Sequence, residues 1–198
     1  KVLKTPSPVF LFRARKGWSN YNTRCMWSKY DSDDGKIFKR TMVFWTSLRP
    51  RQFSKKKILM KVIKREGKPT AIQAAAVRDF AESFPLTTEG DNKEIQKKRP
   101  STPKVITGPR SLEEQKKLYL HQVETFPVAY ATGRCLLLGK GECTLWITAE
   151  YVQNPPNECL FVMLALCGPV VYEAYRHELD NCKGYEEVFG EQYPAKKS

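Results

Sequence analysis

The chain has 198 residues, of which 41% are hydrophobic and 12% aromatic, and its formal net charge is +13. This composition excludes a disordered chain and leaves room for one sizeable core or two small ones. The longest apolar run, residues 159–167, is too short to cross a bilayer as a helix, and the charge favours a polyanionic partner.

The excess positive charge is confined to the first third of the chain. Residues 1–30 contain seven basic and no acidic residues, residues 31–35 contain three aspartates, and residues 36–68 contain twelve basic residues and one acidic residue. The remaining 130 residues therefore carry a net charge of −2. Ten of the 23 aromatic residues fall within the first 53 positions, and interleaved cations and rings are typical of single-stranded nucleic acid sites.

Three strands are predicted in this basic part. Residues 23–30 and 36–46 form a β-hairpin through Asp34-Gly35, a favoured turn pair. The second strand has apolar residues on both faces, which is typical of a central strand. A third strand is predicted at residues 58–64, and the cation-rich segment 47–57 is expected to be an exposed loop.

Two helices and a linker are predicted next. Residues 69–84 begin with Pro69 and place apolar residues at three- and four-residue spacing, so they favour a helix that Pro85 ends. The polar residues 86–104 are expected to be a loop or linker. Ser111 and Glu114 fit a capping box, which predicts a helix from Leu112 to Glu124.

The last third predicts a second hairpin, from residues 128–138 and 142–151, in which the second strand alternates between two faces. Residues 159–167 favour a buried strand, and a final helix is expected from Pro169 to about Asn181.

The predicted fold class is α+β, with mostly antiparallel sheet built from two β-hairpins and additional strands, packed by about three helices. We expect a basic β-rich part with one helix at 1–85, a linker at 86–104 and a near-neutral α+β part at 105–198. Whether the two parts form one domain is left open.

The six cysteines include no CxxC pair and are interpreted as reduced core residues. The opening residues do not resemble a signal peptide. The expected localisation is therefore intracellular, in the cytoplasm, the nucleus or a virion.

No motif for metal binding or catalysis is found. Residues 31–36, DSDDGK, lack the later ligands of an EF-hand loop, and the cysteines and histidines lack the spacing of a zinc site. Neither a G-x-S-x-G nor a complete P-loop motif occurs. We expect no metal, no cofactor and no enzymatic activity.

The main functional hypothesis is a basic protein that binds nucleic acid, such as RNA, or a nucleoprotein through phosphate contacts. The candidate phosphate contacts are Arg40, Arg49, Arg51, Lys55, Lys56, Lys57 and Lys61, and the candidate stacking residues are Trp45 and Phe53.

Two alternatives stay open. The order of a basic part, strands, an alanine-rich helix, a loop and a second sheet with a terminal helix resembles that of rhabdovirus matrix proteins. The resemblance implies a structural scaffold that self-associates and contacts nucleocapsid and an anionic membrane. The third hypothesis is an enzyme whose site is assembled from residues far apart in the sequence.

Overall fold

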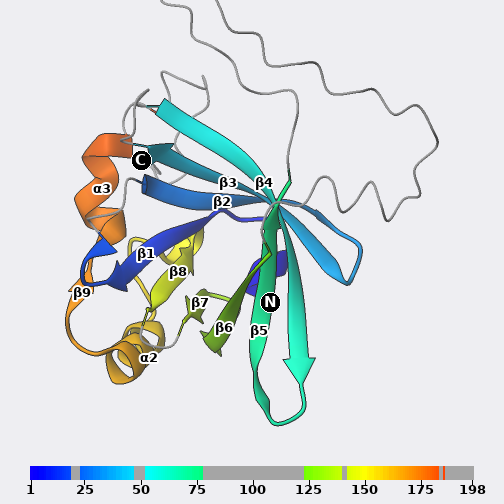
Figure 1. The fold of residues 1–198 in the computed structure, drawn as a ribbon. Coiled ribbons are helices and arrows are strands. Elements are labelled where there is room, and N and C mark those ends of the chain that lie inside the picture. The colour runs from blue at the N-terminus through cyan, green and yellow to red at the C-terminus, as the bar shows by residue number, and fades with distance from the viewer. Residues whose placement is uncertain (19–22, 47–51, 78–122, 140–141, 183–184, 186–198) are drawn as a thin grey trace, which may run out of the picture.

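The protein, seen here in a computed structural model, is described at residues 1–18, 23–46, 52–77, 123–139, 142–182 and 185. Within these residues eight strands form a closed antiparallel barrel, because each strand pairs with the next along the chain and the eighth returns to the first (Figure 1). The strands are β1 (Val9–Arg15), β2 (Thr23–Asp33), β3 (Ile37–Thr46), β4 (Gln52–Arg65), β5 (Lys68–Ala76), β6 (Glu124–Ala131), β7 (Cys135–Leu138) and β8 (Thr144–Thr148). A short strand, β9 (Val171–Tyr172), pairs with the end of β1.

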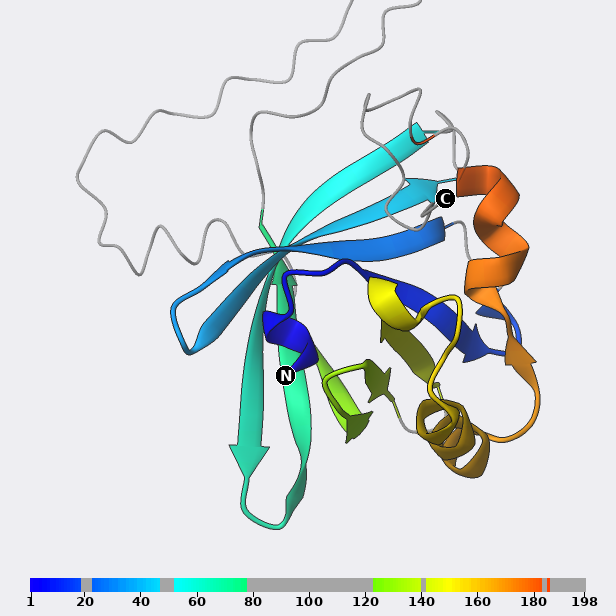
Figure 2. The same ribbon diagram turned by 180° about the vertical axis from the view of Figure 1, so that it is seen from behind.

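Two helices, α2 (Asn157–Cys167) and α3 (Ala174–Cys182), lie on the same side of the barrel (Figures 1 and 2). Two 3-10 turns, η1 (Val2–Lys4) and η3 (Ala149–Tyr151), complete the described elements. Side chains alternate along each strand, so the barrel wall has an inner and an outer apolar layer. In β8, for example, Leu145 and Ile147 belong to the outer core with α2 and α3, whereas Trp146 lines the interior.

Three disulfides fasten the helices to the outer surface of the barrel. Cys25 of β2 is bonded to Cys182 of α3, and two further bonds join the region of β7 and β8 to α2. These two bonds are Cys135–Cys159 and Cys143–Cys167. The prediction of reduced cysteines is wrong, because all six cysteines are paired in disulfides. The paired residues are 157, 24 and 24 positions apart in the sequence, so only the fold brings them together.

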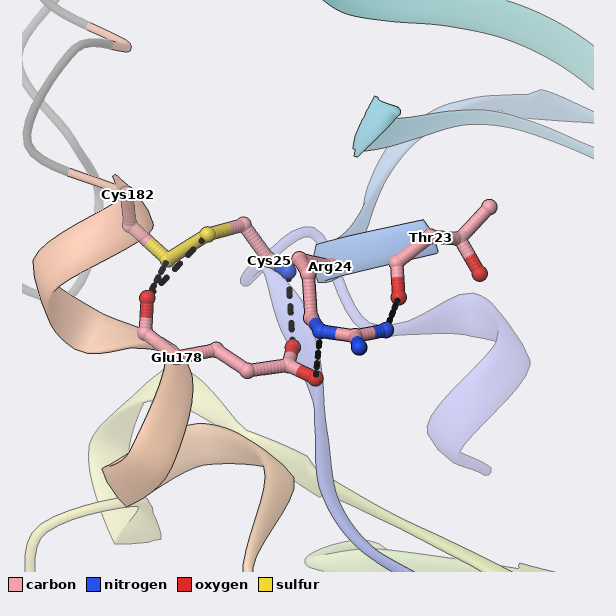
Figure 3. The surroundings of a disulfide bond; sticks show 5 residues. All are labelled: Thr23, Arg24, Cys25, Glu178 and Cys182. Atoms are coloured by element: carbon pink, nitrogen blue, oxygen red, sulfur yellow. Dashed lines mark hydrogen bonds and ion pairs between the residues drawn. A yellow bond between two sulfur atoms is a disulfide. The ribbon is translucent and has the colours of Figure 1, made fainter. Parts of the chain in front are cut away.

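The bond between β2 and α3 lies beside a buried carboxylate (Figure 3). Cys25 has a φ of 52°, in an irregular stretch of β2, and its N–H donates to Glu178 Oε2 over 2.8 Å. Arg24 Nε lies 3.8 Å from Glu178 Oε1. Burial raises the pKa of the Glu178 carboxyl, and its hydrogen bond from Cys25 and the charge of Arg24 oppose this shift. The irregularity in β2 therefore turns Cys25 toward α3.

The predicted α+β class with about three helices is wrong. Residues 69–76, the first part of the predicted helix at 69–84, belong to strand β5, whose backbone pairs with both β4 and β6. Ile72 and Ala74 alternate with Gln73 and line the interior, so tertiary pairing overrides the helical spacing of the apolar residues. The rest of that predicted helix, residues 78–84, lies outside the described residues.

The predicted strand at residues 159–167 is also wrong, because this segment belongs to helix α2. Cys159 and Met163, four residues apart, are buried against the barrel, while Phe161 and Leu164 are exposed. Both faces of this helix are apolar, so the sequence shows neither the 3.6-residue period of a helix nor the two-residue period of a strand. A short apolar run of this kind is compatible with a helix or a strand.

The first predicted hairpin is confirmed as β2 and β3, with Gly35 at a φ of 85° in the turn. The predicted third strand is part of β4, which begins at Gln52, so residues 52–57 are strand and not loop. The predicted final helix exists but begins at Ala174 and ends at Cys182.

The second predicted hairpin is wrong in its first strand. Residues 128–138 contain the end of β6, a turn and β7, which pairs with β6. The turn is stabilised by Thr132 Oγ1, which accepts hydrogen bonds from the N–H groups of Arg134 and Cys135. The linker at 86–104 and nearly all of the predicted helix at 112–124 lie outside the described residues, and Glu124 begins β6. Strands from both predicted parts of the chain share the one barrel.

Candidate ligand-binding cavity

The barrel encloses a cavity of about 490 Å³. Twenty of the described residues line it, sixteen of them apolar, and every strand of the barrel contributes at least one. The apolar lining includes Val9, Ile58, Ile72, Phe126, Leu136 and Trp146. The volume lies within the range of about 300–1,000 Å³ found for small-molecule sites.

Three of the four methionines of the chain, Met26, Met42 and Met60, line this cavity. They come from the adjacent strands β2, β3 and β4. Methionine side chains are flexible and polarisable, so they adapt to the shape of an apolar guest. This wall of the cavity is therefore suited to contact with a hydrocarbon surface.

Among the described residues that line the cavity, Arg40 is the one cation, and it is only 1% exposed. Its Nε donates to Ser28 Oγ over 3.1 Å, and its Nη1 donates to the carbonyl oxygens of Leu3 and Thr5 over 3.2 and 3.1 Å. Its Nη2 donates to the carbonyl oxygens of Ser7 and Ser28 over 3.4 and 3.1 Å. The five donors of the guanidinium group are thus directed at acceptors of the protein.

These bonds hold the N-terminal segment against the barrel. Val2 and Leu3 of η1 line the cavity, and Val2 belongs to one buried cluster with Ile72 of β5 and Leu136 of β7. Desolvation lowers the pKa of Arg40 to about 10, an effect opposed by the charges of Asp31 and Tyr30, so the group stays cationic at neutral pH.

A further hydrogen bond within the lining joins Trp146 Nε1 to Thr144 Oγ1 over 3.1 Å. Ser28 Oγ accepts from Arg40, and Glu124 lies at the exposed start of β6. Because its polar groups are few and mostly bonded to the protein, the cavity suits a guest that is mainly apolar.

The structure separates the nine residues predicted to bind nucleic acid. Arg40 and Phe53 are buried, at 1% and 8% exposure, and Phe53 packs edge-on against Tyr185 with ring centroids 5.6 Å apart. Trp45 is half-buried and packs against the outer core. These three side chains therefore do not form an exposed stacking and phosphate surface.

Of the remaining predicted residues, Lys55, Lys56, Lys57 and Lys61 are exposed on β4. The Nζ atom of Lys55 lies 6.0 Å from the ring centroid of Tyr185, and the Nζ atom of Lys56 lies 5.7 Å from that of Phe44. Arg49 and Arg51 lie outside the described residues.

Two features are absent from the described part of the chain. It contains no group of three or more His, Cys, Asp or Glu side chains that could hold a metal ion. None of its helices has the length and apolar character needed to span a bilayer.

Sequence reasoning missed the cavity residues, although one signal was present. The strand at 37–46 is apolar on both faces, and the structure explains this because Val43 belongs to the outer core while Met42 faces the interior. An open sheet covered on both sides gives the same pattern, so the barrel itself was not predicted.

No protein-family model and no curated protein matches the chain. Among solved structures, it is similar to Japanin from Rhipicephalus appendiculatus bound to cholesterol, with a TM-score of 0.52 and 13% sequence identity. The similarity covers 87% of this chain and 93% of the Japanin chain. An eight-stranded up-and-down barrel around a single small-molecule cavity is the architecture of lipocalins.

The predicted function is therefore corrected. The hypotheses of a nucleic-acid- or nucleoprotein-binding protein and of a viral matrix scaffold are wrong, as are their partners: nucleic acid, nucleoprotein, anionic membrane and further copies of the chain. Two findings overturn them: the barrel of this chain has an internal apolar cavity, and the similar structure of Japanin is bound to cholesterol. What the chain shares with Japanin, at 13% identity, is a lipocalin-like barrel fold.

Proposed function

We propose that the protein binds one small, largely apolar molecule inside its barrel. The observation that carries this proposal is the cavity of about 490 Å³ with sixteen apolar lining residues. Burial of apolar ligand surface in such a site contributes roughly 25 cal/mol per Å². A site of this volume is large enough for that contribution to support specific binding.

The chemistry of the lining favours a neutral ligand. The donors of Arg40 are engaged by five acceptors of the chain, so a carboxylate head group would have to displace some of these bonds. A sterol is the first ligand class to test, because the similar barrel of Japanin is bound to cholesterol.

The absence of enzymatic activity stays a prediction, and the intracellular localisation is replaced by a new proposal. Three disulfides favour an oxidising compartment over the cytosol or nucleus. We therefore propose a non-enzymatic carrier or scavenger of an apolar molecule that works outside the reducing compartments of the cell.

Replacing Ala74 by Trp is expected to weaken sterol binding by about tenfold or more, equivalent to 1.4 kcal/mol. Ala74 lines the cavity on β5, where it pairs with Met60 and Glu124, so an indole ring there would occupy ligand volume. The measurement is an equilibrium titration with a fluorescent sterol.

The matched control is Gln73→Trp, which adds the same ring at the adjacent residue of β5, on the other face of the strand. This variant should keep the affinity of the unsubstituted protein within about twofold, which is less than 0.5 kcal/mol. If Ala74→Trp bound the sterol as tightly as the unsubstituted protein, or if Ala74→Trp and Gln73→Trp lost the same affinity, the sterol would bind outside the cavity.

A further inference from the structure

We propose that the outer face of β2, β3 and β4 binds a sulfated polysaccharide at a surface separate from the cavity. Five exposed lysines occupy this face and are named here the lysine face: Lys29, Lys39, Lys55, Lys57 and Lys61. All five have odd numbers, as do the outer-core residues Trp27, Val43 and Phe53, whereas the residues of these strands that line the cavity, such as Met42 and Met60, have even numbers.

The strand register brings these lysines into one patch. Lys29 is opposite Thr41, and Thr41 is opposite Lys57, so the two lysines lie on either side of the central strand β3. With strands about 4.8 Å apart, their Cα atoms are roughly 10 Å from each other. Lys61 lies four residues along β4 from Lys57, roughly 13 Å away. Cations spread over this area fit an extended polyanion better than a single anion.

The charge of the lysine face is only partly compensated. Lys55 and Lys57 each interact with another group, whereas no ion pair among the described residues includes Lys29, Lys39 or Lys61. Two carboxylates lie nearby. Asp31 accepts from Thr41 Oγ1 over 2.9 Å, and Asp34, in the turn, accepts from the backbone N–H groups of residues 36 and 37. The face therefore keeps an excess of positive charge.

The kind of polyanion follows from what the lysine face offers. A single-stranded nucleic acid needs exposed rings for base stacking, but Trp45 and Phe53, the rings at the end of this face, pack into the outer core. All five cations are lysines, which act as point charges and lack the bidentate fork of arginine. Three disulfides favour an extracellular setting, where sulfate esters on polysaccharides are the abundant polyanions.

The test compares two triple variants that remove the same charge. Lys39→Ala, Lys57→Ala and Lys61→Ala remove cations from the lysine face, and Lys1→Ala, Lys16→Ala and Arg176→Ala remove exposed cations from elsewhere. Affinity for a heparin oligosaccharide is measured at physiological salt. The first variant should bind about tenfold more weakly than the unsubstituted protein, and the second should change about twofold, because a local patch and not total charge sets the attraction.

Three results would overturn the proposal. These are no heparin binding at physiological salt, equal loss in the two triple variants, and undiminished binding to heparin from which the sulfates have been removed. Tighter binding of duplex DNA than of heparin, lost in the same variant, would assign the face to nucleic acid instead. Ala74→Trp should keep its heparin affinity, so failure here and failure of the cavity proposal are distinguishable.

Discussion

Replacing Arg40 by Ala is expected to lower the free energy of unfolding by about 3 kcal/mol or more. The substitution removes the donors to four backbone carbonyl oxygens, those of Leu3, Thr5, Ser7 and Ser28. Each buried acceptor left without a partner costs about 1–3 kcal/mol unless water reaches it. Denaturant titration of the two proteins measures the loss.

The same substitution should release the N-terminal segment from the barrel. Amide hydrogen exchange at residues 2–5 and 7 is expected to become faster in the Ala variant, because Arg40 connects this segment to β2 and β3. Arg40→Met keeps much of the side-chain volume without the donors and should behave like Ala. The neighbouring Lys39→Ala, which changes an exposed side chain, should leave stability unchanged within about 0.5 kcal/mol. Unchanged stability and exchange in both Arg40 variants would contradict the role assigned to Arg40.

Removing the Cys25–Cys182 bond by substitution of both residues with Ala is expected to cost about 4–5 kcal/mol. The bond closes a loop between residues 157 positions apart, and in the chain-entropy account a longer loop gives the larger stabilisation. The measurement is the denaturant midpoint under non-reducing conditions, together with hydrogen exchange in α3.

The matched control removes Cys143 and Cys167, which are 24 positions apart and fasten α2 to the barrel. This pair should cost about 3 kcal/mol, less than the long-range pair. The reverse order of the two losses would show that strain or local packing, and not loop closure, determines how much each bond contributes.

The β-hairpin at residues 23–46 could be predicted because its signals are local. Asp34 and Gly35 form the turn, and the strands on either side alternate over several residues. The faces of β8 were predicted for the same reason, since Leu145 and Ile147 are buried on one face and Trp146 points to the other. Local turn chemistry and alternation are read directly from sequence.

The barrel and its cavity could not be predicted, because both depend on contacts between distant segments. The alanine-rich residues 72–76 have helical spacing, and only pairing with β4 and β6 makes them a strand. Likewise, the three cysteine pairs are set by the position of the helices on the barrel. Arg40 was predicted to contact phosphate on the basis of its charge, yet its environment is a set of backbone carbonyls contributed by residues 3–7 and 28.

The most direct test of the barrel as a ligand-binding protein is native mass spectrometry of the disulfide-bonded protein incubated with cholesterol. We predict one bound sterol per chain in the unsubstituted protein and in Gln73→Trp, and at least about tenfold lower occupancy in Ala74→Trp at subsaturating sterol, because the cavity of about 490 Å³ inside the barrel is the binding site. A protein that takes up no sterol or other neutral lipid, or that takes up several copies regardless of the Ala74 substitution, would contradict this account.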